Sequence, residues 1–83
     1  MISCQVALYP LADPKFTAVI DEALARIEAI PELHIEVGPM STYLLGEQEK
    51  IWDALQILFQ TSIQNDRKIV MNVQMSNECG CDL

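Results

Sequence analysis

The segment ISCQVALY, residues 2–9, alternates between two kinds of side chain. Its even-numbered positions are all apolar, whereas its odd-numbered positions are polar, small or aromatic. A period of two with a single apolar face is typical of a β-strand that buries one side and leaves the other open. Pro10 ends this pattern, so the chain is expected to begin with a half-buried strand.

The period changes after this strand. Asp13-Pro14 has the residue types of a helix start, an aspartate at the N-cap and a proline at the first helical position. From Phe16 to Ile27 the apolar residues recur at the spacing of one helix face. Pro31 predicts that this amphipathic helix ends near Ala29.

The remaining elements follow from the same two periods. Alternation and chain breakers predict strands over residues 33–37, 42–45 and 68–76, and a helix over 48–64 that ends at Asn65-Asp66. The order β-α-β-β-α-β, with two right-handed crossovers and a central hairpin, predicts a ferredoxin-like α+β fold. Its four-stranded antiparallel sheet has the order 4-1-3-2, with both helices on one face. The other face, called the open face, is expected to carry Gln5, Ala7, Asn72, Gln74 and Ser76.

Length and charge limit the classes of protein that fit. The chain has 83 residues, 51% of them hydrophobic, so we expect one domain over residues 1–83 with a flexible tail from about residue 77. Its net charge of −7 leaves no basic patch for nucleic acid or an anionic membrane. The absence of a secretory signal and of a membrane-length apolar run predicts a cytoplasmic protein.

Signals of catalysis are weak, so we expect a protein that is not an enzyme. His34 is the single histidine, and no serine or cysteine has a recognisable base partner in the sequence. The paired carboxylates, such as Asp21-Glu22, fall on helix surfaces, and no glycine-rich phosphate loop is present.

The three cysteines suggest an alternative, a soft-metal or redox module. Cys79 and Cys81 form a C-x-C pair, and the predicted strand order brings Cys4 toward them. The pattern has no fourth ligand and lies at a chain end, so we expect no metal site. Three cysteines cannot all pair within one chain, so the sequence does not indicate a fold held together by disulfides.

Several motifs resemble one family. They are CQVALYPL at residues 4–11, Met40-Ser41-Thr42 followed by Leu45-Gly46, Trp52-Asp53-Ala54, and KIVMN at residues 68–72 with Ser76, Cys79 and Asp82. In this order they resemble the YkoF-like thiamine-binding family over roughly residues 2–82. The resemblance implies a non-catalytic protein that binds thiamine or its hydroxymethylpyrimidine moiety as a ligand, with no cofactor. The type protein carries two such domains in one chain, whereas this chain has one. The resemblance therefore also implies a homodimer or homotetramer, in which separate copies replace the covalent duplication.

The open face supplies candidates for reading an aminopyrimidine, whose edge has one amino donor and two ring-nitrogen acceptors. The candidate ligand-binding residues are Gln5, Tyr9, Ser41, Thr42, Asn72 and Ser76. An aromatic side chain such as Tyr9 would suit the thiazolium cation. The alternative is that the amides bond across a dimer interface and that Ser41 and Thr42 stabilise the turn. A structural oligomerisation domain is then the other function that fits, since the last strand is an unprotected edge.

Overall fold

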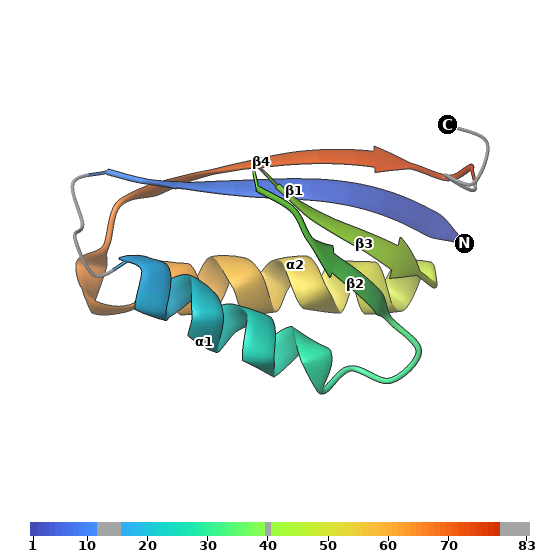
Figure 1. The fold of residues 1–83 in the computed structure, drawn as a ribbon, viewed down its shortest axis with the longest axis horizontal. Helices are drawn as coiled ribbons and strands as arrows, with labels where there is room; N and C mark the ends of the chain where they lie inside the picture. The colour runs from blue at the N-terminus through green and yellow to red at the C-terminus, as the bar shows by residue number, and fades with distance from the viewer. Residues whose placement is uncertain (12–15, 40, 79–83) are drawn as a thin grey trace.

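The computed structural model describes residues 1–11, 16–39 and 41–78 as a single sheet with two helices (Figure 1). The elements are β1 (Ile2–Pro10), α1 (Phe16–Glu28), β2 (His34–Val37), β3 (Thr42–Gly46), α2 (Gln48–Ser62), the short 3-10 helix η1 (Gln64–Asp66) and β4 (Ile69–Ser76). The predicted helix start at Asp13-Pro14 lies outside the described residues.

The sheet has the strand order β2-β3-β1-β4, and all of its neighbouring strands are antiparallel. Both helices lie on one side of it (Figure 1). The prediction of a ferredoxin-like fold with this order is therefore confirmed. β1 is the strand on which the sheet depends, because it pairs with β3 along one edge and with β4 along the other.

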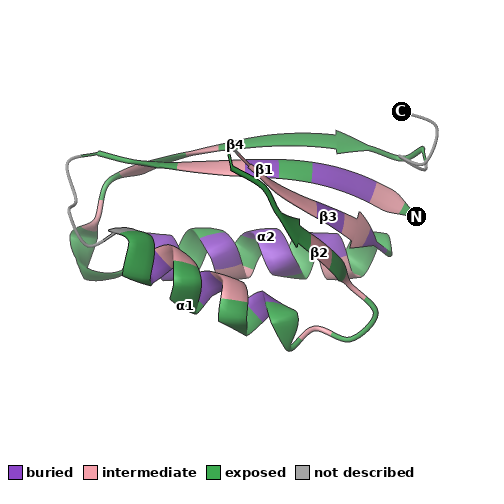
Figure 2. Cartoon of the chain, viewed as in Figure 1, coloured by how far each residue is buried: buried purple, intermediate pink, exposed green. Residues whose placement is uncertain are grey.

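The pairing register divides the side chains between the two faces. Cys4 lies opposite Leu44 and Met75, and these residues belong to the row that faces the helices. Gln5 lies opposite Tyr43 and Gln74, and these belong to the open face. The helix-facing row contributes Cys4, Val6 and Leu44 to the core, and the helices contribute Val19, Ala23, Ile27, Ile51, Ala54, Leu55 and Leu58. Figure 2 shows this core between the sheet and the helices.

Local backbone geometry ends α2 earlier than predicted. The Ile63 N–H still bonds to the Phe59 carbonyl at 3.1 Å, but Asn65 and Asp66 adopt φ of 61° and 60°. Asparagine and aspartate tolerate this left-handed conformation better than most residues. The chain consequently leaves α2 at Ser62 and turns through η1 into β4.

The end of the described chain folds back toward β1. The Ser3 hydroxyl donates to the Glu78 carbonyl at 3.3 Å, and the Glu78 N–H donates to the Ser76 hydroxyl at 3.1 Å. Most of the tail that the sequence predicts to be flexible, residues 79–83, lies outside the described residues. No helix in the described segments is both long and apolar enough to cross a membrane.

Neighbouring leucines on β3 test the assignment of the two faces. Leu44 is fully buried in the core, whereas Leu45 faces the open side. Leu44→Ala should lower the free energy of unfolding by about 2–5 kcal/mol, because it leaves a cavity in the core. The matched change Leu45→Ala should lower it by roughly 1 kcal/mol. Urea unfolding of both variants measures these changes in the free energy of unfolding. An equal or larger loss for Leu45→Ala would contradict the assignment of the two faces.

Candidate ligand-binding site

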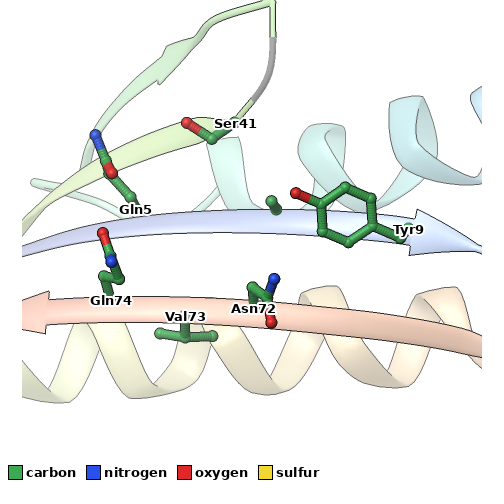
Figure 3. A pocket seen from close by; sticks show the side chains of 7 residues that line it. Gln5, Tyr9, Ser41, Asn72, Val73 and Gln74 are labelled. Carbon is green, nitrogen blue, oxygen red and sulfur yellow. The ribbon is translucent and has the colours of Figure 1, made fainter.

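A half-open cavity of about 420 Å³ lies on the open face, over β1 and β4 and beside the start of β3 (Figure 3). It is lined by Gln5, Ala7, Tyr9, Ser41, Asn72, Val73 and Gln74. A volume of this order is within the range of small-molecule sites. The cavity is therefore the candidate site on the face that the helices leave open.

The register of β1 and β4 brings the polar side chains of this site together. Gln5 lies directly opposite Gln74, and Ala7 lies directly opposite Asn72. Side chains two residues apart on a strand share a face, so Gln5, Ala7 and Tyr9 form one row and Asn72 and Gln74 the next. Figure 3 shows the three amides along these two neighbouring strands. The small Ala7 leaves room between them.

Ser41 enters the cavity from the turn that joins β2 and β3. Its carbonyl accepts a hydrogen bond from the Gly38 N–H at 2.9 Å, which holds the turn closed. A Cβ atom at position 38 would come within 3.1 Å of this same carbonyl oxygen, so glycine permits the close approach. The turn thereby places a hydroxyl beside the β1 row, between the positions of Gln5 and Tyr9 (Figure 3).

The described lining has no charged side chain, and five of its seven residues have side chains that can form hydrogen bonds. Each carboxamide offers an NH2 donor and a carbonyl acceptor, and the hydroxyls of Tyr9 and Ser41 offer both functions. Within the described residues, no intramolecular hydrogen bond occupies the side chains of Gln5, Asn72 or Gln74. Such a surface suits a neutral, planar ligand edge that presents both donors and acceptors.

Four of the six predicted ligand-binding residues line this cavity: Gln5, Tyr9, Ser41 and Asn72. Ser76 lies on the same face but further along β4, where it lines a neighbouring cavity with Ser3, Tyr43 and Gln74. Its hydroxyl already accepts the bond from the Glu78 N–H. Ser76 therefore shares a cavity with Gln5 but not with Tyr9, Ser41 or Asn72.

Thr42, which the sequence predicts to lie near the open face, points to the other face of the sheet. Thr42 pairs with Val6 on one side and with Val37 on the other, and Val6 is buried beneath the helices. Since paired residues in an antiparallel sheet point to the same face, Thr42 belongs to the helix-facing row. Ser41 and Thr42 are adjacent in the chain and so point to opposite faces, and only Ser41 reaches the open-face cavity.

Sequence reasoning did not include Gln74 among the ligand-binding candidates, although it placed Gln74 on the open face. The missing information was the register. Gln74 lies opposite Gln5. Once β1 and β4 are aligned, a ligand-binding role for Gln5 therefore makes Gln74 a candidate as well. The alternation of β4 alone cannot supply that alignment.

The sequence matches the model of the YKOF-related family over residues 1–82. The chain belongs to the YKOF-related family. This match confirms the family suggested by the sequence motifs. The chain matches no curated protein.

Solved structures share the fold of this YKOF-related chain. A Thermotoga maritima structure, described as that of a "putative thiamine biosynthesis/salvage protein", is 26% identical, with a TM-score of 0.75 over 93% of this chain and 83% of that one. A Streptococcus pneumoniae protein is 24% identical, with a TM-score of 0.81 over 98% and 92%. A hypothetical protein of Methanocaldococcus jannascii is 18% identical, with a TM-score of 0.80 over 95% and 81%. The last two show likeness of fold alone.

The His34 imidazole and the Glu36 carboxylate form a separate polar pair on β2 of the YKOF-related chain. His34 Nε2 and Glu36 Oε1 are 2.9 Å apart, and both side chains are more than half exposed. They lie opposite Leu45 and Tyr43, so β3 stands between them and the cavity over β1 and β4. The pair is a solvated contact at the sheet edge.

Cys4 is poorly suited to the alternative soft-metal or redox role. Its side chain is buried in the core, and this burial raises the pKa of the thiol. A thiolate, not a thiol, is the metal ligand and nucleophile, so a raised pKa disfavours both roles. Cys79 and Cys81 lie outside the described residues. In the part of the chain that is described, no three metal-ligating side chains come together.

Thiol labelling tests the burial of Cys4. In the double variant Cys79→Ser, Cys81→Ser, Cys4 is the one remaining thiol. A disulfide reagent at pH 8 should react with the folded variant at least about 100-fold more slowly than in urea, because reaction requires an opening of the fold. Because burial raises the pKa, the folded rate should go on rising above the pH at which the unfolded thiol is fully ionised. Equal rates in buffer and in urea would contradict a buried Cys4.

Proposed function

We propose that this chain is a non-catalytic binding protein for thiamine or its hydroxymethylpyrimidine moiety, and that the ligand lies in the open-face cavity. Its role would be sequestration or delivery of the ligand. The proposal rests chiefly on one observation: three carboxamides, those of Gln5, Asn72 and Gln74, surround Ala7 with no partner among the described residues. The likeness to the Thermotoga maritima structure described as that of a "putative thiamine biosynthesis/salvage protein" supports the choice of ligand.

The chemistry of an aminopyrimidine matches carboxamides. Its edge presents an exocyclic amino donor next to a ring-nitrogen acceptor. A single Asn or Gln side chain can accept from the amino group and donate to the ring nitrogen at once, as in the recognition of adenine. Asn72, directly across from Ala7, has the position for this paired contact, and Gln5 and Gln74 remain for the second ring nitrogen.

The shape of the site favours a flat ring. Ala7 is the smallest side chain on the floor of the cavity, so a planar pyrimidine can approach the sheet there while the amides rise on either side. Tyr9 lies one position further along the same row and is about half exposed. Its ring offers a π-face to the thiazolium cation of thiamine.

The absence of charge on the described lining favours binding over catalysis. General acid–base chemistry most often uses a histidine, a carboxylate or a lysine within hydrogen-bonding reach of the substrate, and among the described lining residues the Tyr9 phenol is the single side chain that can serve in this way. A histidine and a carboxylate, His34 and Glu36, lie close together on β2, but β3 separates them from the cavity. A site of amides, hydroxyls and one aromatic ring can recognise a ligand and hold it.

Calorimetric titration with thiamine and with hydroxymethylpyrimidine tests the proposal. We expect one site per chain and a Kd at or below the micromolar range, about −8 kcal/mol. Asn72→Leu and Gln5→Leu should each weaken binding at least about 10-fold, because each removes hydrogen bonds worth roughly 1–1.5 kcal/mol. Thr42→Val, which removes a hydroxyl from the opposite face, is the matched control and should leave the Kd unchanged. Absence of heat with both ligands would contradict the proposed function, and loss with Thr42→Val alone would contradict the site.

The two ligands also separate the role of Tyr9 from that of the amides. Tyr9→Leu removes the π-face and should weaken thiamine binding about 3- to 30-fold, since a cation–π contact contributes roughly 0.5–2 kcal/mol. Hydroxymethylpyrimidine carries no thiazolium, so its Kd should change little. The ratio of the two affinities in wild type and variant is the measurement. An equal loss for both ligands would show that Tyr9 does not contact the thiazolium.

A further inference from the structure

β1 extends beyond the segment of β3 that pairs with it. The described ladder between β1 and β3 ends at the pair Val6–Thr42, whereas the ladder between β1 and β4 continues as far as Pro10. Among the described strands, residues 7–10 of β1 therefore have a neighbour on the β4 side alone. Figure 3 shows β1 running on past Ser41, the residue before β3. The gap beside residues 7–10 is called the β1 notch.

Backbone hydrogen bonds show which way each residue of β1 directs its N–H and C=O groups. The Leu11 N–H donates to the Lys68 carbonyl at 2.9 Å, which lies on the β4 side. In an antiparallel ladder, one residue directs both groups to one neighbouring strand, and the next residue directs them to the other. The odd-numbered residues of β1 therefore bond to β4, and the even-numbered residues direct their groups to the β3 side. The bond that closes the turn between β2 and β3 gives the same result, because it directs the groups of Thr42 to Val6.

Leu8 is the residue that this geometry leaves without a strand partner. Its N–H and C=O groups point into the β1 notch, and no described residue forms a hydrogen bond with them. Pro10, the other even-numbered residue beside the notch, has no N–H. Proline within a strand is confined to positions whose nitrogen faces away from a paired strand, so Pro10 fits this unpaired edge. Leu8 is half-buried, and unpaired backbone groups in such a place favour an external hydrogen-bonding partner.

A cavity of about 190 Å³ lies in the β1 notch, between the sheet and the helices. α1 contributes Ile20 and Leu24 to its lining and α2 contributes Leu58, and none of the described lining residues is charged. Ala7 and Ser41 line both this cavity and the open-face cavity, so the two are neighbours. A cavity of about 150 Å³ is known to hold benzene. The notch cavity therefore has room for one six-membered ring and not for the two rings of thiamine.

We propose that the β1 notch binds an uncharged, single-ring heterocycle through the backbone of Leu8. The ligand class is a cyclic amide or amidine, in which an N–H donor is adjacent to a carbonyl or ring-nitrogen acceptor. Such an edge donates to the Leu8 carbonyl and accepts from the Leu8 N–H, as the facing residue of another strand would. The apolar side chains of Ile20 and Leu24 contact the ring. An ionised ligand would be buried here without an opposite charge, which is unfavourable.

This ligand class differs from the ligand proposed for the open face, and the inference does not depend on that proposal. In hydroxymethylpyrimidine, a methyl group and a hydroxymethyl group flank the amidine edge on its two sides. The backbone of β1 continues on both sides of Leu8, so these groups would collide with it. A side-chain amide such as that of Asn72 ends at its carbonyl and NH2 groups and leaves room for them. The notch therefore selects an unhindered edge.

NMR titration of the full chain with 2-pyridone tests the proposal, with N-methyl-2-pyridone as the matched probe. The first compound has an unhindered cyclic amide edge, and the N-methyl group of the second removes the donor. We expect 2-pyridone to shift the backbone N–H resonance of Leu8 saturably, with a Kd at or below about 1 mM for so small a ligand. The N-methylated probe should bind at least about 10-fold more weakly, because it loses a hydrogen bond and obstructs the edge.

Side-chain variants separate the notch from the open face. Ile20→Trp fills part of the notch cavity and should weaken 2-pyridone binding at least about 10-fold. Ala25→Trp introduces the same residue at an exposed position of α1 and should leave binding unchanged. Asn72→Leu, which removes an amide of the open-face cavity, should also leave it unchanged. If Ile20→Trp fails to fold, Val37→Trp at the exposed rim of the notch cavity replaces it.

Hydrogen exchange tests the backbone geometry without a ligand. The N–H groups of Ala7 and Tyr9 point to β4, whereas that of Leu8 has no partner in the described part of the chain. We expect the Leu8 N–H to exchange at least about 10-fold faster than those of its two neighbours, and we expect saturating 2-pyridone to slow it.

Saturable shifts of the Leu8 resonance support the proposal if N-methylation of the probe and Ile20→Trp both weaken them. The proposal is overturned if millimolar 2-pyridone leaves this resonance unchanged, if the N-methylated probe binds equally well, or if Leu8 exchanges as slowly as Ala7 and Tyr9. Binding that Asn72→Leu abolishes also overturns it, because the probe would then lie on the open face.

Discussion

The pairing of β1 with β3 and with β4 determines which face of the sheet the residues of these strands point to. Side chains alternate along β1, so Cys4 and Val6 point toward the helices and Gln5 and Ala7 toward the open face. A shift of one residue would exchange the two sets, placing amides in the core and valines in the cavity. Burial of the helix-facing row excludes that shift, because unpaired amides in a core are unfavourable by a few kcal/mol each. The same register that builds the core therefore assembles the candidate site.

The two helices leave part of the four-stranded sheet uncovered, and the uncovered surfaces are of two kinds. The open face is polar where β1 and β4 lie side by side, with amides free to bond a ligand. The helix-facing side of β4 is apolar and bordered by Trp52 and Phe59. Hydrogen-bonding groups around a small cavity favour a small planar molecule, whereas an apolar groove beside a free strand edge favours a second protein surface. One strand, β4, contributes to both.

Much of this arrangement could be predicted from the sequence, because it depends on periods of two and 3.6 residues. The polar content of the open face follows from alternation in residues 2–9 and 68–76, and the fold and strand order follow from the order of helices and strands along the chain. What the sequence could not supply is register between distant strands. Without it, the sequence does not show which face Thr42 points to, since a short strand after a turn gives little sign of which of its residues are buried. For the same reason Gln74 was not matched to Gln5. The exposure of Trp52 depends on how far α2 reaches across the sheet, which is a tertiary property.

Side-chain amide resonances offer the most direct test of where the ligand lies. In a ¹⁵N-labelled sample, the NH2 groups of Gln5, Asn72 and Gln74 report on the open-face cavity. The NH2 group of Gln56 and the indole N–H of Trp52 report on the apolar groove between α2 and β4. On titration with thiamine, the account predicts saturable shifts of the first three resonances and little change in the other two. Shifts confined to Gln56 and Trp52, or no shift at saturating thiamine, would contradict a thiamine site on the open face.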